Sequence, residues 1–296
     1  MDKSGGVAER YYEPESLDEL SDLVKKLNIE GESFDLVGNT SNIYFKNSYN
    51  SQNLISTKLL NKWIDNGDTI VCECGVNVMK LSRNMIELGA VGFEGLIDLP
   101  GTIGGAVYGN AGCFKCSISS LLKSVKLLKP DGQIVELSYS ELSFSKRSSA
   151  LKRKEIRGVI LSVTLTKKLS DNIEKLKALA ERNHQQRKQM QPSPAHNLGT
   201  TYCQFGKRTL LGEGIKQLGR LYYHLMRVVG YDANTCNRLV WKFELLMVGG
   251  RAVVPYLHSL GRFIWKDEKA DDVFKKYQKV LNRLYKNPSL EIEIKE

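Results

Sequence analysis

The 296-residue sequence lacks several features that would place it in a specialised class of protein. No stretch approaches the roughly 18 consecutive apolar residues of a membrane-spanning helix, so no membrane segment is expected. Prolines number only seven, and no internal repeat or low-complexity segment is present. The first residues, Met1 to Gly6, lack the apolar core of a secretory signal. We therefore expect a globular protein of the cytoplasm.

Cysteine and histidine are also scarce. The six cysteines do not follow a disulfide framework, and the four histidines show no metal-ligand spacing, so no metal site is expected. Cys113 and Cys116 form a C-x-x-C pair, which could indicate redox or metal chemistry. No second pair follows at zinc-ribbon spacing, and small buried thiols are favoured instead.

The chain is basic, with a net charge of +10 from 43 basic and 33 acidic residues. Such a surface could attract nucleic acid, serve an anionic small molecule, or be merely solvated. Because the basic residues are spread along the chain, we do not expect a nucleic-acid partner.

The element pattern predicts an α+β fold. A capping box at Ser16 and Glu19 begins a helix that runs to about Leu27, and Gly89 closes a helix that begins near Asn77. Further helices are predicted at 171–191, 214–229 and 271–285. Strands are predicted at 34–37, 43–45, 54–55, 69–74, 124–128, 133–137, 159–165, 251–254, 262–265 and 290–294. A domain boundary is expected near Lys168.

Two loops rich in glycine and hydroxyl groups stand out. Gly38 to Asn42 follows a strand, and its backbone N–H groups could surround phosphate oxygens, although a tight turn favours the same residues. Pro100 to Gly105 has three glycines, which permit close approach of the backbone to another group. Neither loop reads G-x-G-x-x-G or G-x-x-x-x-G-K-[ST], so dinucleotide-binding Rossmann and P-loop sites are excluded.

The order of these loops resembles the UDP-N-acetylenolpyruvoylglucosamine reductase family, flavoenzymes of peptidoglycan synthesis. That family has Gly-x-Gly-Ser-Asn in the first loop, where this chain has Gly38 to Asn42. It then has Gly-x-Glu-x-Leu, Pro-Gly-Thr-x-Gly-Gly-Ala and Asn-Ala-Gly. This chain has Gly92 to Leu96, Pro100 to Ala106, and Asn110 to Gly112 at these places. The resemblance is strong through Lys168 and patchy beyond.

The resemblance implies non-covalent FAD and a two-lobed FAD-binding domain of the vanillyl-alcohol-oxidase type at 1–168. An α+β substrate-binding domain would follow at 169–296, and NADPH would be the reductant. The two loops would hold the pyrophosphate and isoalloxazine, and the backbone near Ile160 would also touch the flavin. The implied cofactor residues are Gly38, Asn39, Thr40, Ser41, Asn42, Pro100, Gly101, Thr102, Ile103, Gly104, Gly105, Asn110, Ala111, Gly112 and Ile160.

The resemblance also implies catalytic residues. In the family, hydride passes from NADPH to FAD and then to an enolpyruvyl double bond, an arginine and a glutamate stabilise the developing enolate, and a serine supplies a proton. The arginine motif Phe-x-Tyr-Arg-x-Ser matches Phe144 to Ser149 except at Lys146, which implies that Arg147 binds the substrate's carboxylate or enolate and that Lys146 adds a charge for an anionic substrate. An ordinary surface arginine is the alternative.

The serine and glutamate motifs match less well. Arg187, Gln191 and Pro192 match a segment before the serine, whose place is taken by Thr200. Leu-Glu-Pro-Glu-Val matches 290–294 with Ile292 for proline, which points to Glu293, although a solvent-facing glutamate is equally open. Arg147, Thr200 and Glu293 would surround the reactive face of the flavin.

Three functions are compatible with these motifs. The chain could reduce UDP-N-acetylenolpyruvoylglucosamine. It could instead be a paralogue that oxidises, reduces or epimerises another nucleotide sugar of capsule or lipopolysaccharide synthesis. It could also bind flavin without turnover. Segment 211–246 departs most from the family, with a helical, aromatic and basic run.

Overall fold

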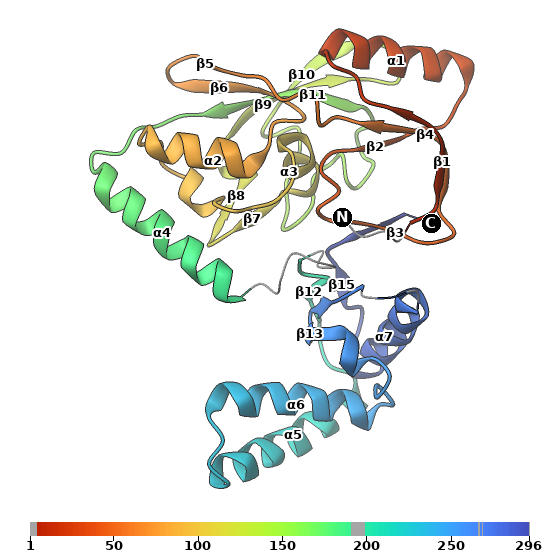
Figure 1. Cartoon of the computed structure of the whole chain (residues 1–296), viewed down its shortest axis with the longest axis vertical. Helices are drawn as coiled ribbons and strands as arrows, with labels where there is room; N and C mark the ends of the chain where they lie inside the picture. Colours follow the sequence, from red (N-terminus) through yellow and green to blue (C-terminus); the bar gives the residue numbers. More distant parts are fainter. Residues whose placement is uncertain (1–4, 191–198, 266, 268, 296) are drawn as a thin grey trace. The chain divides into compact units, whose positions relative to one another are not determined.

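The computed structural model describes residues 5–190, 199–265, 267 and 269–295, which form two compact units (Figure 1). The N-terminal unit contains residues 7–41 and 50–190. The C-terminal unit contains the described residues of 1–6, 42–49 and 191–296. Both helices and sheets occur in each unit, which confirms the predicted α+β class.

This division differs from the predicted domains 1–168 and 169–296. Residues 173–190 stay with the N-terminal unit because helix α4 (Ile173–Met190) packs on α2 (Val78–Glu87) and on the short helix η1 (Phe93–Gly95). Residues 42–49 join the C-terminal unit because strand β3 (Ile43–Phe45) pairs in parallel with β16 (Glu293–Lys295). Gln191 and Pro192, where the sequence predicts that α4 stops, lie outside the described residues.

The N-terminal unit contains two sheets. One is a parallel sheet of order β1-β4-β2, and the other is an antiparallel sheet of order β10-β9-β11-β6-β5. Both faces of β11 are largely buried, as expected for a central strand. The strands are β1 (Val7–Tyr12), β2 (Asp35–Val37), β4 (Asn50–Ser56), β5 (Trp63–Asp65), β6 (Thr69–Glu73), β9 (Leu122–Leu128), β10 (Ile134–Ser138) and β11 (Val159–Thr166), with a small hairpin of β7 (Gly112–Cys113) and β8 (Cys116–Ser117).

Helix ends in this unit follow the local sequence. Helix α1 (Leu17–Glu30) begins after Ser16, whose hydroxyl accepts a hydrogen bond from Glu19 N, and it ends at Gly31 with φ 69°. Helix α2 begins after Asn77, whose side chain accepts from Lys80 N, and Gly89 follows it with φ 79°. Both capping predictions are confirmed.

Two local predictions were wrong. Pro100 to Gly105 is not a loop throughout, because helix α3 (Ile103–Gly109) begins inside it after the N-cap Thr102. Residues 251–254 are not a strand. They form turns that lead into a short helix, η3 (Val254–Tyr256), where Gly250 accepts from Val253 N and Pro255 occupies a first-turn position that does not need its missing N–H.

The C-terminal unit packs three helices around an aromatic core. Trp265, Phe263 and Tyr277 are almost fully buried there, and Phe263 contacts both of the other two rings. No helix in the described part of the chain is both long and apolar enough to cross a membrane. The helices are α5 (Leu210–Val228), α6 (Ala233–Met247) and α7 (Ala270–Leu284), and the short strands are β12 (Tyr202–Gln204), β13 (Leu257–Ser259), β14 (Arg262–Phe263) and β15 (Ser289–Leu290).

Candidate functional site

The two predicted loops lie against each other in the N-terminal unit. A Cβ atom at Gly38 would lie 2.3 Å from Thr102 Oγ1, and one at Gly101 would lie 2.9 Å from Ser41 Oγ. Gly101 also has φ 117°, which side chains rarely adopt. Glycine at both positions therefore lets the two backbones meet, so that residues 38–41 and 101–105 border one region.

The glycines at the start of α3 serve two different purposes. Gly104 N donates to Cys74 O at 2.8 Å, and a Cβ atom at residue 104 would lie 3.0 Å from Cys74 Cβ and O. Gly104 therefore seats the helix on β6. Gly105 is exposed, and its Cβ would meet only Thr102 Oγ1, at 3.4 Å. Burial raises the pKa of the Cys74 thiol to about 12, so Cys74 is a neutral packing residue.

The first loop offers backbone donors. Within the described part of the chain, no hydrogen-bond acceptor is found for the N–H groups of Asn39, Thr40 and Ser41. Thr40 has φ 48° and is thus left-handed, at the position where the reductase motif has its second glycine. Successive N–H groups beside a left-handed residue can gather around an anion.

The second predicted segment meets the arginine loop. Asn110 ends α3 with φ 45°, and its Nδ2 donates to Ser145 O at 2.7 Å. Ser145 and Ser148 pair with each other, so Lys146 and Arg147 form the tip of a tight turn. Arg147 has φ 59°, and its Nη2 donates to Gly112 O at 2.6 Å. Arg147 is therefore half-buried beside the predicted cofactor segment, whereas Lys146 is exposed.

Asn110 also carries an unsatisfied acceptor. The residue is only 7% exposed, so water does not replace a protein partner. Its Oδ1 finds no donor among the residues that the structure describes. Buried polar atoms are nearly always hydrogen-bonded, so such an atom fits a bound group that carries an N–H or O–H donor. The residues present are therefore compatible with a polar ring system next to Arg147.

A hollow of about 430 Å³ opens where β11 begins. Sequence reasoning singled out Ile160, but the Ile160 side chain belongs to the core and its backbone pairs with Leu127 of β9. The hollow itself was not predicted from the sequence. The local pattern that could have indicated it is a basic residue before a glycine, Arg157-Gly158. The lining residues are Tyr108, Leu151, Lys154, Ile156, Arg157 and Gly158.

Three other predicted residues lie in the C-terminal unit. Glu293 N donates to Asn42 O at 2.9 Å, and Asn42 Nδ2 donates to Glu291 O at 3.1 Å. Glu291 N in turn donates to Thr201 O at 2.8 Å. These bonds connect Asn42 and Glu293 to the strand that follows Thr200. Thr200 is half-buried, whereas Thr201 is fully buried and its hydroxyl accepts from Phe263 N.

The candidate residues are thus divided between the units. Arg147, Ile160, residues 38–41 and residues 100–112 belong to the N-terminal unit, and Asn42, Thr200 and Glu293 belong to the C-terminal unit. The roles inferred for these residues stay predictions.

The part of the chain that carries the two loops is similar to known proteins. Residues 8–138 match the family model of an FAD binding domain. Over 161 residues the chain is 37% identical to a UDP-N-acetylenolpyruvoylglucosamine reductase of Streptococcus pneumoniae (strain JJA), a match that covers 54% of this chain and 53% of the relative. Over this length the chain is similar to the UDP-N-acetylenolpyruvoylglucosamine reductases, and its FAD binding domain is the part that the family model matches.

A second relative extends the similarity. The UDP-N-acetylenolpyruvoylglucosamine reductase of Caldicellulosiruptor saccharolyticus is 28% identical over 200 residues, which is 68% of this chain and 64% of the relative. The chain therefore spans less than two thirds of the length of the curated relatives it matches. The crystal structure of the corresponding reductase from Thermus caldophilus is 21% identical and superposes with a TM-score of 0.66, over 99% of this chain and 94% of that chain, which shows a shared fold.

Proposed function

We propose that the protein is an FAD-dependent oxidoreductase that reduces UDP-N-acetylenolpyruvoylglucosamine, or a close nucleotide-sugar analogue, at the expense of NADPH. The observation that carries the proposal is the contact of Arg147 with Gly112, beside the unsatisfied Oδ1 of Asn110. The Arg147 guanidinium, which can bind an anion, lies beside an acceptor that has no donor. Both are at residues 110–112, where the resemblance implies that the flavin binds. Relatives with this activity in their names support the same reading.

The cofactor would be held by residues of the N-terminal unit. The N–H groups of Asn39 to Ser41 suit the pyrophosphate, and exposed Gly105 permits close approach of the cofactor to α3. Lys154 and Arg157 in the hollow before β11 add positive charge for an anionic cofactor. Once reduced by NADPH, FAD bound there would supply the hydride for the substrate's double bond.

Arg147 would bind the carboxylate or the enolate oxygen of the substrate. Its guanidinium is planar and always charged, and it presents paired donors to a planar anion. The bond to Gly112 O restrains the side chain before substrate arrives, so less conformational entropy is lost on binding. Lys146, exposed at the same turn, would attract a second anionic group.

Thr200 and Glu293 would act on the proton and on the developing charge. The Thr200 hydroxyl replaces the family's serine and keeps the ability to donate a proton, although its methyl group restricts χ1. The Glu293 carboxylate lies 3.5 Å from Lys295 Nζ, so it is already close to a positive charge.

A paralogue that acts on another nucleotide sugar is the second candidate. Lys146 stands where the family has tyrosine, and 210–247 forms the two helices α5 and α6 in the segment that departs most from the family. A flavoprotein without turnover is the third. A cytoplasmic location and the absence of a nucleic-acid partner also stay predictions.

The test is a visible absorption spectrum of the purified protein, followed under anaerobic conditions by NADPH and then by UDP-N-acetylenolpyruvoylglucosamine. We expect flavin bands that bleach with NADPH and return with the substrate. Bleaching without return would favour another nucleotide sugar, and a panel of such sugars then identifies it. If the flavin spectrum changes with neither a reductant nor any of the sugars, the result favours a protein that binds flavin without turnover. Colourless protein that takes up no added FAD would contradict the proposal.

A further inference from the structure

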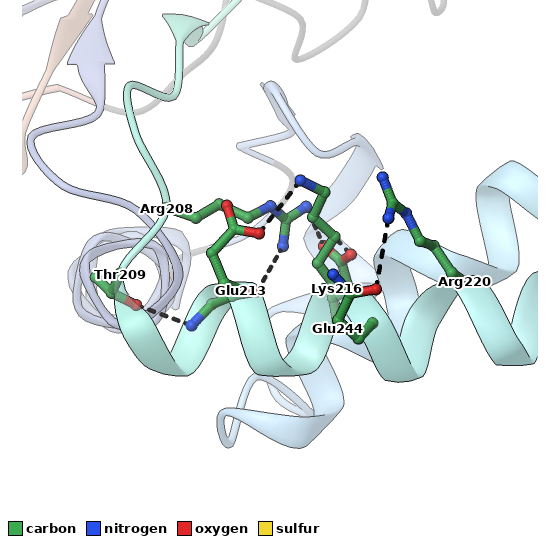
Figure 2. A network of polar contacts seen from close by, with 8 residues as sticks. Arg208, Thr209, Glu213, Lys216, Arg220 and Glu244 are labelled. Atoms are coloured by element: carbon green, nitrogen blue, oxygen red, sulfur yellow. Dashed lines mark hydrogen bonds and ion pairs between the residues drawn. The ribbon is translucent and has the colours of Figure 1, made fainter.

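Helix α5 has three distinct faces along its 19 residues. One face is buried against α6 and α7: Gly212 lies against Leu284 of α7, Gly219 lies against Val240 and Glu244 of α6, and the Tyr222 ring stacks on Phe243 at 5.0 Å. A second face is charged and carries Glu213, Lys216 and Arg220 (Figure 2). The third face is apolar and exposed. Its exposed fractions are Leu211 55%, Leu218 47%, Leu221 70%, Leu225 55% and Val228 85%.

The exposed apolar face follows a heptad repeat. Leu211, Leu218 and Leu225 are seven residues apart, and Gly214, Leu221 and Val228 repeat with the same spacing three residues later. These are the a and d positions of a helix that packs along its length against another helix. A surface helix of a globular protein needs one apolar stripe for its own core. Helix α5 has two, and the buried stripe already has α6 and α7 as its partners, so the exposed one has the form of an interface.

We infer that the exposed face of α5, defined by Leu211, Gly214, Leu218, Leu221, Leu225 and Val228, is a dimer interface that pairs antiparallel with α5 of a second copy of this chain. A two-fold axis near residues 219 and 220 places Leu211 opposite Val228 and Leu218 opposite Leu221. It also places Leu225 opposite Gly214, where no atom lies within 4 Å of a Cβ position, so a large side chain meets a small one.

Charge supports the antiparallel arrangement. The first turn of α5 is acidic at Glu213 and the last turn is basic at Arg227. Antiparallel helices bring the acidic end of each copy to the basic end of the other, and their dipoles oppose each other favourably. Gln217 and His224 lie beside the exposed apolar face, on the side away from α6. Neither carries a carboxylate or a permanent cation, so like charges do not meet across the proposed interface.

The size and rigidity of the face are adequate for self-association. A helix of this length spans about 28 Å. Burying the exposed apolar face along that length on both copies gives a total buried area that approaches the roughly 1,200 Å² of a small specific interface. The helix is also fixed before pairing. Thr209 caps its first turn, and Arg208 pairs with Glu244 of α6 at 2.9 Å (Figure 2).

The test is the molar mass of the full-length protein by sedimentation velocity and light scattering, over a dilution series in the micromolar range. We expect a dimer that Leu221→Glu converts to a monomer with unchanged circular dichroism and thermal midpoint. Leu225→Glu serves as a second variant on the same face. Ile29→Glu is the matched control, because Ile29 is 86% exposed on α1, and it should leave the dimer intact.

Cysteine cross-linking tests the direction of pairing. The double variant Leu211→Cys/Val228→Cys should form an intermolecular disulfide on mild oxidation, because the antiparallel pair places residue 211 of one copy against residue 228 of the other, whereas Leu211→Cys alone should not. A wild-type protein that is monomeric at every concentration would overturn the inference and leave another partner for this face. A dimer unaffected by Leu221→Glu and Leu225→Glu would overturn it too. Neither result depends on flavin content, so the inference can fail while the proposed function stands.

Discussion

Gly38 and Thr102 approach so closely that a Cβ atom at residue 38 would lie 2.3 Å from Thr102 Oγ1. The same hydroxyl caps α3 by accepting a hydrogen bond from Gly105 N at 3.3 Å. Thr102 is therefore held between the first loop and the helix, and the two segments that carry the family motif support each other. A side chain at residue 38 would push apart the N–H groups of residues 39–41 and the start of α3.

The adjacent glycines 104 and 105 should respond differently to substitution. Gly104→Val places bulk against Cys74, so we expect a loss of stability of about 1–3 kcal/mol and colourless protein. Gly105→Leu places its side chain on the exposed side of α3, where its Cβ makes only an ordinary contact with Thr102 Oγ1, so it should keep the wild-type thermal midpoint and yet bind about tenfold less FAD. Flavin content and thermal denaturation separate the two effects. A Gly105→Leu protein with full flavin would show that the cofactor does not approach α3.

Arg147→Ala should leave the flavin bound and reduce turnover. Removal of one charge-stabilising donor costs about 10²–10³ in rate in comparable sites. Arg147→Lys should recover little, because an ammonium cannot reproduce the paired donors. The measurements are flavin content and steady-state rates with the substrate found in the absorption test. Arg238→Ala, an exposed arginine on α6, is the control. Loss of flavin from Arg147→Ala would mean that the residue supports the cofactor instead.

Thr40→Gly should stabilise the protein. Thr40 has φ 48°, and the left-handed conformation costs an L residue roughly 1–2 kcal/mol. Glycine removes that strain, at an entropic cost of about 0.5–1 kcal/mol. We expect the free energy of unfolding in urea to rise by up to about 1 kcal/mol, with FAD still bound. A less stable Thr40→Gly protein would mean that the threonine side chain makes a contact worth more than the strain.

Stability should fall on the alkaline side of pH 9. Burial raises the pKa of Cys72 and of Cys74 from 9.0 to about 12. A folded-state pKa above the unfolded value contributes stability that is complete below pH 9 and is lost as the pH rises towards 12. Each thiol adds a slope of up to about 1.4 kcal/mol per pH unit. Urea denaturation at pH 8, 9 and 10 measures it.

The double variant Cys72→Ala/Cys74→Ala is the control for this slope. Its stability will be lower at every pH because two core side chains are truncated, but its decline between pH 9 and 10 should be shallower than that of the wild type. The interval ends at pH 10 because buried tyrosines such as Tyr277, whose pKa is also raised, add their own dependence above it. Parallel declines in both proteins would refute the assignment to the thiols.

Local signals were sufficient wherever the deciding contacts are local. The caps at Ser16 and Asn77 and the glycines at 31 and 89 act within one helical turn, so their residue types specify the helix ends. Strand β1 (Val7–Tyr12) escaped sequence reasoning because most of its side chains are exposed, which removes the alternation that identifies a half-buried strand. Residues 251–254 were predicted as a strand because three of the four are aliphatic or small. The glycines before them allow a turn instead, in which Val253 N donates to Gly250 O.

The sequence by itself determined the resemblance to the reductase family, the α+β class and the motif segments at residues 38–42 and 100–112, because those segments depend on glycines and hydroxyl groups at fixed spacing. Only the tertiary structure decided that Gly38 meets Thr102, that Arg147 is bound to Gly112, and that β3 pairs with β16 about 250 residues later. These contacts join segments distant in the chain, and the space available to each side chain depends on how the core packs. No local pattern encodes that space, nor which of the apolar faces of α5 stays exposed.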